Sequence, residues 1–180
     1  MMIKTKLIGI SGCTNGGKTT LSKKLIAEFK NCVYLQQDDF YYPRTEQYLD
    51  YIPELESFNF DVISAINMEK FHQEVRRLID MNIYDYIILD GFILFEDKKL
   101  YNMLDRRYFL YLNKEDCLRR RISRNYKSID TPNYFDRCVW PEFLKYKAKC
   151  EANYKDIVYI NGSNSVDYIF NYVLNDIKDI

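Results

Sequence analysis

The chain has 180 residues, and its 26 basic and 26 acidic side chains leave a formal net charge of zero. This length suits one domain with a sizeable hydrophobic core. A zero net charge supplies no overall field that would recruit nucleic acid or an anionic membrane, so small molecules are the expected partners. The five cysteines are scattered and never form C-x-x-C, which argues against a disulfide framework or a zinc site.

The chain shows no targeting or membrane segment by its pattern. No charged-then-apolar leader starts it, and the best apolar run, residues 86–95, is broken by Asp90 and Gly91. We therefore expect a cytoplasmic protein without membrane contact. No repeat, low-complexity tract or linker divides residues 1–180, which predicts a single domain, present as a monomer or a weak homo-oligomer.

The first predicted strand, residues 6–10, runs directly into GCTNGGKT at residues 12–19, which fits G-x-x-x-x-G-K-[ST] in full. Leu21, Leu25 and Phe29 follow at helical spacing. In such a loop the backbone N–H groups surround a phosphate, the lysine reaches the β/γ oxygens, and the hydroxyl that follows can bind Mg²⁺. The pattern predicts a nucleoside triphosphate site formed by Gly12, Cys13, Thr14, Asn15, Gly16, Gly17, Lys18, Thr19 and Thr20.

Further along the chain, strands alternate with helices. Residues 32–36 form a short predicted strand, and a loop over 41–59 contains Pro43 and Pro53. Apolar spacing then predicts a helix through Val62, Ile63, Ile66, Phe71, Val75 and Leu78.

Residues 86–90 form a continuous apolar run that ends in an acid, as expected of a strand buried on both faces of a parallel sheet. Residues 108–112 and 157–160 are the fourth and fifth predicted strands, and a helix runs from Val166 to Ile177. Five strands separated by helices predict an α/β P-loop NTPase fold, with a doubly wound five-stranded parallel sheet flanked by helices and a small lid. Ligands of such sheets lie at the carboxyl ends of the strands.

Three acids follow strand ends and are candidates for chemistry. Asp90 has the form of a Walker B acid that binds Mg²⁺ directly or through water, the alternative being a cap of a turn or helix. Asp38 and Asp39 follow the second strand, where a kinase places the base for its acceptor hydroxyl, the alternative being a solvated turn. The only histidine, His72, lies on a predicted helix, so we expect any general base to be a carboxylate.

Arginines cluster at residues 119–124. Arg120 and Arg124 share one helix face, and Arg121 and Arg124 are neighbours at i, i+3. The polar stretch 125–131 ends before Pro132 and suits a mobile lid over a nucleotide. Together these features favour arginines that contact phosphates over a merely solvated basic helix.

Residues 113–116 match N-K-x-D, the guanine-reading motif of P-loop GTPases, and offer a different interpretation, a GTP-binding switch. A GTPase also needs D-x-x-G after its Walker B strand, whereas Asp90 is followed by Gly91 and Phe92. Asn113 is in addition a natural helix N-cap, with Asp116 at the third helical position. We therefore expect these two residues to cap a helix.

The chain resembles the nicotinamide riboside kinases over nearly its whole length. The matching segments are residues 8–21, 37–40, 60–61, 67–70, 90–95, 119–121, 134–136 and 139–141. The resemblance implies phosphorylation of the ribose 5′-hydroxyl of nicotinamide riboside by ATP and Mg²⁺, which gives nicotinamide mononucleotide for NAD biosynthesis. A uridine/cytidine-type kinase, which shares the P-loop and an aspartate after the second strand, is the alternative.

The resemblance also implies roles for individual residues. Lys18 and Asp38 are the implied catalytic residues, with Asp38 as the base; Thr19, Asp38 and Asp90 are the implied ligands of Mg²⁺. On the nucleoside side, the implied contacts are Asp38, Asp39, Phe40, Tyr41, Phe60, Asp61, Arg121 and Tyr126. The implied ATP contacts beyond the P-loop are Arg120, Arg124, Tyr126, Asn164, Ser165 and Val166.

Two departures from the family pattern affect these expectations. The family usually has glutamate at the Walker B position, where this chain has Asp90, and the shorter acid favours Mg²⁺ bound through a water. Phenylalanine and tyrosine are exchanged at Tyr41 and Phe60, which keeps stacking but changes the available hydroxyls.

Overall fold

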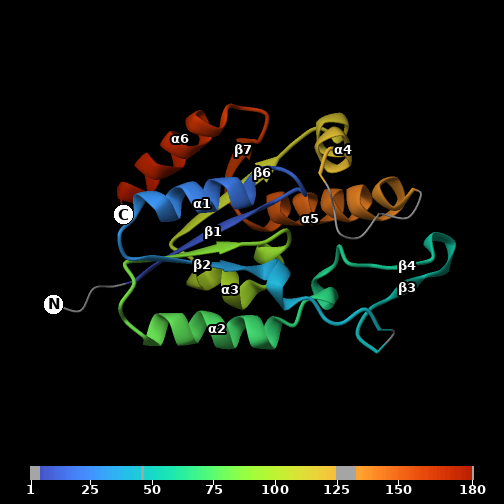
Figure 1. Ribbon diagram of the computed structural model, residues 1–180, viewed down its shortest axis with the longest axis horizontal. Helices are drawn as coiled ribbons and strands as arrows, with labels where there is room; N and C mark the ends of the chain where they lie inside the picture. The colour runs from blue at the N-terminus through green and yellow to red at the C-terminus, as the bar shows by residue number, and fades with distance from the viewer. Residues whose placement is uncertain (1–4, 46, 125–132, 180) are drawn as a thin grey trace.

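The structure is a computed structural model and describes residues 5–45, 47–124 and 133–179. Its centre is a parallel sheet with the strand order β2-β5-β1-β6-β7 (Figure 1). The strands are β1 (Lys6–Gly12), β2 (Cys32–Gln36), β5 (Tyr86–Asp90), β6 (Arg106–Tyr111) and β7 (Val158–Asn161). The predicted doubly wound five-stranded sheet is therefore confirmed. The fourth strand begins two residues earlier than its apolar run, because Arg106 and Arg107 pair with β1.

Helices cover both faces of this sheet (Figure 1). Ile8 and Ile10 of β1 and Ile88 of β5 pack under one pair of helices, whereas the alternate residues Ile87 and Leu89 face the opposite side. This alternation lets each central strand bury two apolar faces at once. The first face carries α1 (Lys18–Glu28) and α6 (Val166–Lys178); the second carries α2 (Met68–Asp80), α3 (Lys98–Met103) and α5 (Trp140–Asn153).

The predicted helix through Val62 was wrong at its start. The Asn67 side chain accepts a hydrogen bond from the Lys70 N–H at 3.0 Å and caps α2, which therefore begins at Met68. The apolar residues before it belong to a separate 3₁₀ turn, η3 (Ile63–Ala65). The apolar spacing continues across the capping residue Asn67, so the spacing alone did not reveal where the helix begins.

The segment predicted as a loop over 41–59 contains a short antiparallel hairpin. Its strands are β3 (Tyr51–Ile52) and β4 (Ser57–Phe58), joined by the 3₁₀ turn η2 (Pro53–Leu55). Strands of two residues are too short to show alternation in a sequence. The helices α3 and α5 and the π-helical turn η5 (Phe135–Val139) were also not predicted.

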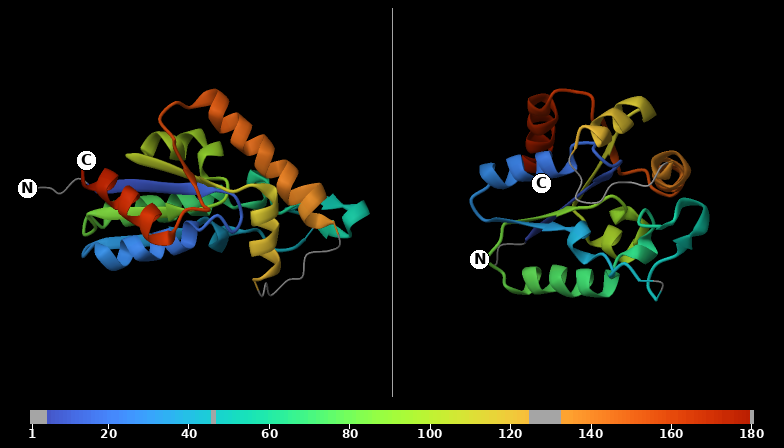
Figure 2. Two further views of the ribbon diagram at one scale, coloured as in Figure 1. Left: turned by 90° about the horizontal axis from the view of Figure 1, so that it is seen from above. Right: turned by 45° about the vertical axis from the view of Figure 1, so that its right-hand side comes forward.

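Two elements extend beyond the carboxyl ends of the central strands. These are the β3–β4 hairpin and α4 (Lys114–Ile122), and they lie on different sides of that edge (Figures 1 and 2). Asn113 caps α4 as predicted, since its Oδ1 accepts a hydrogen bond from the Asp116 N–H at 2.7 Å. The P-loop between β1 and α1 lies at the same edge of the sheet (Figure 1).

All five cysteines are free thiols, and four of them are buried. No described helix is both long enough and apolar enough to cross a membrane.

Candidate active site

The P-loop is shaped by backbone conformations that favour glycine. Gly12, the last residue of β1, has φ 124°, and a Cβ there would lie 2.0 Å from the Leu110 carbonyl oxygen. Gly17 has φ 99° directly before α1. Lys18 Nζ donates hydrogen bonds to the carbonyl oxygens of Gly12 at 3.1 Å and Cys13 at 2.8 Å, so the ammonium group lies inside the loop. The local sequence thus builds the predicted phosphate cradle.

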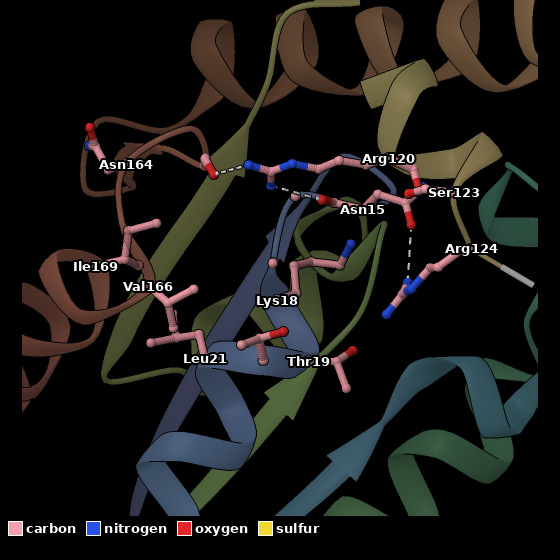
Figure 3. A pocket seen from close by; sticks show the side chains of 14 residues that line it. Asn15, Lys18, Thr19, Leu21, Arg120, Ser123, Arg124, Asn164, Val166 and Ile169 are labelled. Carbon is pink, nitrogen blue, oxygen red and sulfur yellow. Dashed lines mark hydrogen bonds between the residues drawn. The ribbon is translucent and has the colours of Figure 1, made fainter. Parts of the chain in front are cut away.

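A cavity of about 340 Å³ opens beside this loop (Figure 3). Leu21, Val166 and Ile169 give it an apolar end, and Lys18, Arg120 and Arg124 give it a cationic end. A pocket with one flat apolar end and one cationic end matches a nucleotide's base and phosphates. The predicted nucleotide residues that line it are Asn15, Gly16, Gly17, Lys18, Thr19, Thr20, Arg120, Arg124, Asn164 and Val166.

Other predicted nucleotide residues lie elsewhere. Ser165 caps α6, because its hydroxyl accepts a hydrogen bond from the Tyr168 N–H at 3.2 Å. Gly12, Cys13 and Thr14 line a second, narrow cleft. Tyr126 and the predicted lid at 125–131 lie outside the described residues. Leu21, Ser123, Gly162 and Ile169 line the cavity although the sequence did not single them out.

One face of α4 is turned toward the P-loop. The Arg120 guanidinium donates to the carbonyl oxygens of Asn15 at 3.3 Å and Gly162 at 3.0 Å, and so joins two walls of the cavity (Figure 3). Arg124 donates to Asn15 Oδ1 at 3.1 Å. Arg119, by contrast, points away, with 75% of its side chain exposed. The helix ends at Ile122, so Arg124 does not share a helix face with Arg120 as predicted, although both guanidinium groups reach Asn15.

Asp90 lies at the end of β5, 4% exposed, directly beside the first turn of α1. Its Oδ2 accepts a hydrogen bond from the Thr19 hydroxyl at 2.8 Å. A buried carboxylate paired with a hydroxyl next to the phosphate loop is an oxygen donor set of the kind that Mg²⁺ prefers. In the described part of the chain no three His, Cys, Asp or Glu side chains gather into a metal cluster. Mg²⁺ needs no such cluster when phosphates supply its other ligands, so the residues present fit this ion.

Asp38 and Asp39 lie on the 3₁₀ turn η1 (Gln37–Phe40), which directly follows β2. Both side chains are exposed. Desolvation by neighbouring protein atoms raises the pKa of the Asp38 carboxyl, the nearby charge of Lys18 opposes the shift, and the charge of Asp90 adds to it. A raised pKa makes this carboxylate a stronger base than an ordinary aspartate.

Asp61 is brought to the P-loop from the segment after the hairpin. Together with Cys13, Thr14 and Glu142 it lines the narrow cleft that is separate from the nucleotide cavity. The Tyr134 hydroxyl lies 3.1 Å from Asp61 Oδ2 and accepts the Phe60 N–H at 3.1 Å. Arg121 donates to the Thr14 hydroxyl at 3.1 Å and so lies on this side as well. The two residues expected to hold ribose hydroxyls, Asp61 and Arg121, thus both reach this part of the P-loop.

An aromatic group borders this cleft. Tyr41 meets Phe60 edge to face at 5.9 Å and stacks on Phe92 at 5.8 Å between ring centroids. Burial raises the pKa of the Tyr41 hydroxyl far above its ordinary value, and the charges of Asp38 and Asp61 raise it further. Both carboxylates therefore lie close enough to the Tyr41 hydroxyl to act on it electrostatically.

Phe40, which was expected in the base pocket, packs edge-on against Phe71 of α2 and against the core. Sequence reasoning missed Phe92 and Glu142 in the cleft and Tyr134 behind it. Phe92 stands two residues after the Walker B acid, a position that could have marked it. No signal pointed to Glu142, because the helix that carries it was not predicted.

The fold, the P-loop and the cavity beside it place the chain among the P-loop nucleotide-binding proteins. Thymidylate kinase from Candida albicans superposes with a TM-score of 0.65 at 15% identity, covering 98% of this chain and 92% of that one. Deoxyadenosine kinase from M. mycoides, with bound dCTP, gives a TM-score of 0.57 at 14% identity, covering 97% of this chain and all of that one. At these identities the likeness establishes the fold.

Sequence relatives define the family. The family described as AAA domain matches residues 8–141. Nicotinamide riboside kinase 1 from Rattus norvegicus is 39% identical, over 98% of this chain and 95% of its own, and nicotinamide riboside kinase 2 from Homo sapiens is 34% identical, over 96% and 81%. A uridine kinase from Leuconostoc citreum is 28% identical over 69% of this chain and 70% of its own. The chain belongs to the nicotinamide riboside kinase family.

Proposed function

We propose that this protein transfers the γ-phosphoryl group of ATP to the 5′-hydroxyl of nicotinamide riboside and forms nicotinamide mononucleotide. The observation that carries the proposal is the kinship with nicotinamide riboside kinases over nearly the full length of both chains. The arrangement of the P-loop supports it, because residues of this one loop line both the nucleotide cavity and the acid-lined cleft. A donor and an acceptor bound there would both lie against the P-loop.

Different residues of the chain would have different roles in this reaction. Lys18 and the arginines of α4 would hold and neutralise the phosphates, while Asp61 and Arg121 would hold the ribose. Asp38 would accept the proton of the 5′-hydroxyl, a role that its raised pKa favours. Mg²⁺ held by Thr19 and Asp90 would neutralise charge on the phosphates. Catalysis here would be mainly positioning and charge neutralisation, as phosphoryl transfer requires.

The aromatic group around Tyr41 would receive the base. Phe60 and Phe92 both contact the Tyr41 ring, and a cationic pyridinium is attracted to aromatic faces. A neutral pyrimidine would instead need hydrogen-bonding partners for its edge. The same proposal includes a single kinase domain over the given chain.

A substrate panel tests the proposal. Purified protein is given ATP or GTP with Mg²⁺ and one of nicotinamide riboside, uridine or cytidine, and nucleoside monophosphate is quantified. We expect kcat/KM to be highest with ATP and nicotinamide riboside. A higher kcat/KM with uridine or cytidine would refute the proposal in favour of a pyrimidine nucleoside kinase. Hydrolysis of GTP with no acceptor phosphorylated would favour a GTP-binding switch.

A further inference from the structure

The Walker B carboxylate has a second hydroxyl partner, Tyr34 of β2. The Tyr34 hydroxyl donates a hydrogen bond to Asp90 Oδ2 at 2.9 Å, on the same oxygen that accepts the Thr19 hydroxyl at 2.8 Å. Asp90 is 4% exposed, so this carboxylate depends on protein donors rather than on bulk water. Two donors on one oxygen fix the rotation of the carboxylate group and leave its other oxygen, Oδ1, for a different partner.

The contact follows from the register of the sheet. Tyr34 pairs with Ile88 across the β2–β5 ladder, and Asp90 lies two residues further along β5 on the same face. The two residues are therefore diagonal neighbours, a separation that a long side chain can span. The face is the one covered by α1, whose first turn carries Thr19. The register of the sheet thus brings Tyr34 of the edge strand, Asp90 at the end of β5 and Thr19 of the P-loop next to one another.

We propose that Tyr34 is a positioning residue for metal-nucleotide binding, which acts by fixing the Asp90 carboxylate and, through it, the Thr19 hydroxyl. The Thr19 proton is directed into Asp90 by their hydrogen bond, which leaves the lone pairs of its oxygen for a cation. Without the Tyr34 hydroxyl the carboxylate can rotate, and the direction of the Thr19 hydroxyl is no longer fixed. This inference rests on the proposed function only in that a divalent cation accompanies the nucleotide.

Tyr34→Phe removes the hydroxyl and keeps the ring. Binding of Mn²⁺, as a paramagnetic probe, to the protein in the presence of ADP is measured by electron paramagnetic resonance, with no nucleoside present. We expect Mn²⁺ affinity to fall about 10- to 100-fold in the variant. ADP binding without metal, measured by calorimetry, should change less than twofold. The Mg²⁺ concentration that gives half-maximal turnover should rise by a similar factor.

Tyr108→Phe is the matched control. The Tyr108 hydroxyl also donates to a carboxylate on the same face of the sheet, but its acceptor, Asp176, lies near the C-terminal end of α6. Both variants lose one tyrosine–aspartate hydrogen bond, so a comparable drop in melting temperature is expected, with an unchanged Mn²⁺ affinity in Tyr108→Phe. A Tyr34→Phe variant that melts lower yet keeps wild-type Mn²⁺ affinity would overturn the proposal. An equal loss of Mn²⁺ affinity in both variants would do the same.

The outcome of the Mn²⁺ measurement does not depend on which nucleoside accepts the phosphoryl group. If the wild-type protein phosphorylates uridine rather than nicotinamide riboside, the proposed function fails while the Mn²⁺ measurement still reports on Tyr34. If nicotinamide riboside is phosphorylated and Tyr34→Phe binds Mn²⁺ normally, only the role of Tyr34 fails.

Discussion

The Arg120 guanidinium donates to the Gly162 carbonyl oxygen at 3.0 Å and so connects α4 to the loop that follows β7. Its other donor reaches the Asn15 carbonyl oxygen at 3.3 Å. Three segments that are far apart in the sequence, the P-loop, α4 and the loop before α6, are thereby held around one cavity. An arginine in this position supplies both a cation for phosphates and a structural tie between the walls.

Arg120→Ala should weaken ATP binding and leave nucleoside binding nearly unchanged. A charge-assisted hydrogen bond contributes about 1.5–3 kcal/mol, which corresponds to a rise in KM for ATP of roughly 10- to 100-fold. Arg119→Ala is the control, since that side chain lies on the same helix with 75% exposure. Steady-state kinetics with varied ATP measures both. Equal effects of the two substitutions would assign α4 a general electrostatic role instead.

Asp38→Asn separates catalysis from binding and from stability. The amide keeps the shape but cannot accept the proton, so kcat should fall about 10²–10⁴-fold while ATP binding, measured by calorimetry, persists. Retention of wild-type kcat would exclude Asp38 as the base. In the wild type, kcat/KM should fall as the pH is lowered through the raised pKa of Asp38.

The same substitution has a predictable effect on stability. A carboxyl whose pKa is raised on folding stabilises the folded state at low pH, and this contribution is lost as the pH rises through the folded pKa. At pH 8 the ionised Asp38 therefore opposes folding, and Asp38→Asn should melt at the same temperature as the wild type or higher. The advantage should shrink toward pH 5. A lower melting temperature of the variant at pH 8 would contradict the assigned shift.

The N-K-x-D sequence should affect stability but not nucleotide choice. Asn113 caps α4, and Asp116 Oδ2 accepts hydrogen bonds from the Asn113 amide at 3.0 Å and the Ser163 hydroxyl at 3.3 Å. Asn113→Ala should cost about 0.5–2 kcal/mol of unfolding free energy in a urea titration. The ratio of kcat/KM for ATP to that for GTP should stay within about twofold in Asp116→Asn, because no base recognition is lost. Acceptance of xanthosine triphosphate by that variant would instead reveal a guanine site.

Whether a feature could be predicted from the sequence depended on whether its contacts are local in the chain. The cradle around Lys18 was predictable because its glycines, lysine and threonine act within one turn of chain. The cap at Asn113 was equally local and was predicted for the same reason. The start of α2 was wrong because the apolar period ran on through the capping residue Asn67.

Long-range contacts could not be read in this way. Tyr134 meets Asp61 across 73 positions, and Tyr34 meets Asp90 across 56. Both pairs depend on register and on helix placement, which one sequence does not encode in a short pattern. Glu142 was missed because it lies on α5, whose apolar positions were not recognised. The strand-end acids, in contrast, were found because parallel strands end at one edge of the sheet.

The position of Arg44 allows a test of whether a positively charged base binds against the Phe60 ring. Its guanidinium lies over the Phe60 ring, 4.9 Å from the centroid, on an exposed segment before the hairpin. A pyridinium that stacks on Phe60 would compete with this cation for the ring, and like charges would repel. The exposed cation–π contact is worth about 0.5–1 kcal/mol, so Arg44→Gln should lower KM for nicotinamide riboside about two- to fivefold.

The charge dependence of this effect identifies its cause. The decrease in KM should shrink as ionic strength is raised from about 0.05 to 0.5 M, because salt screens exposed charges. Arg77→Gln is the control, since Arg77 is an exposed arginine that pairs with Glu74 on α2. A rise in KM for nicotinamide riboside in Arg44→Gln would show that Arg44 holds the nucleoside rather than competing with it. In that case the aromatic group would bind its substrate through the guanidinium that covers Phe60.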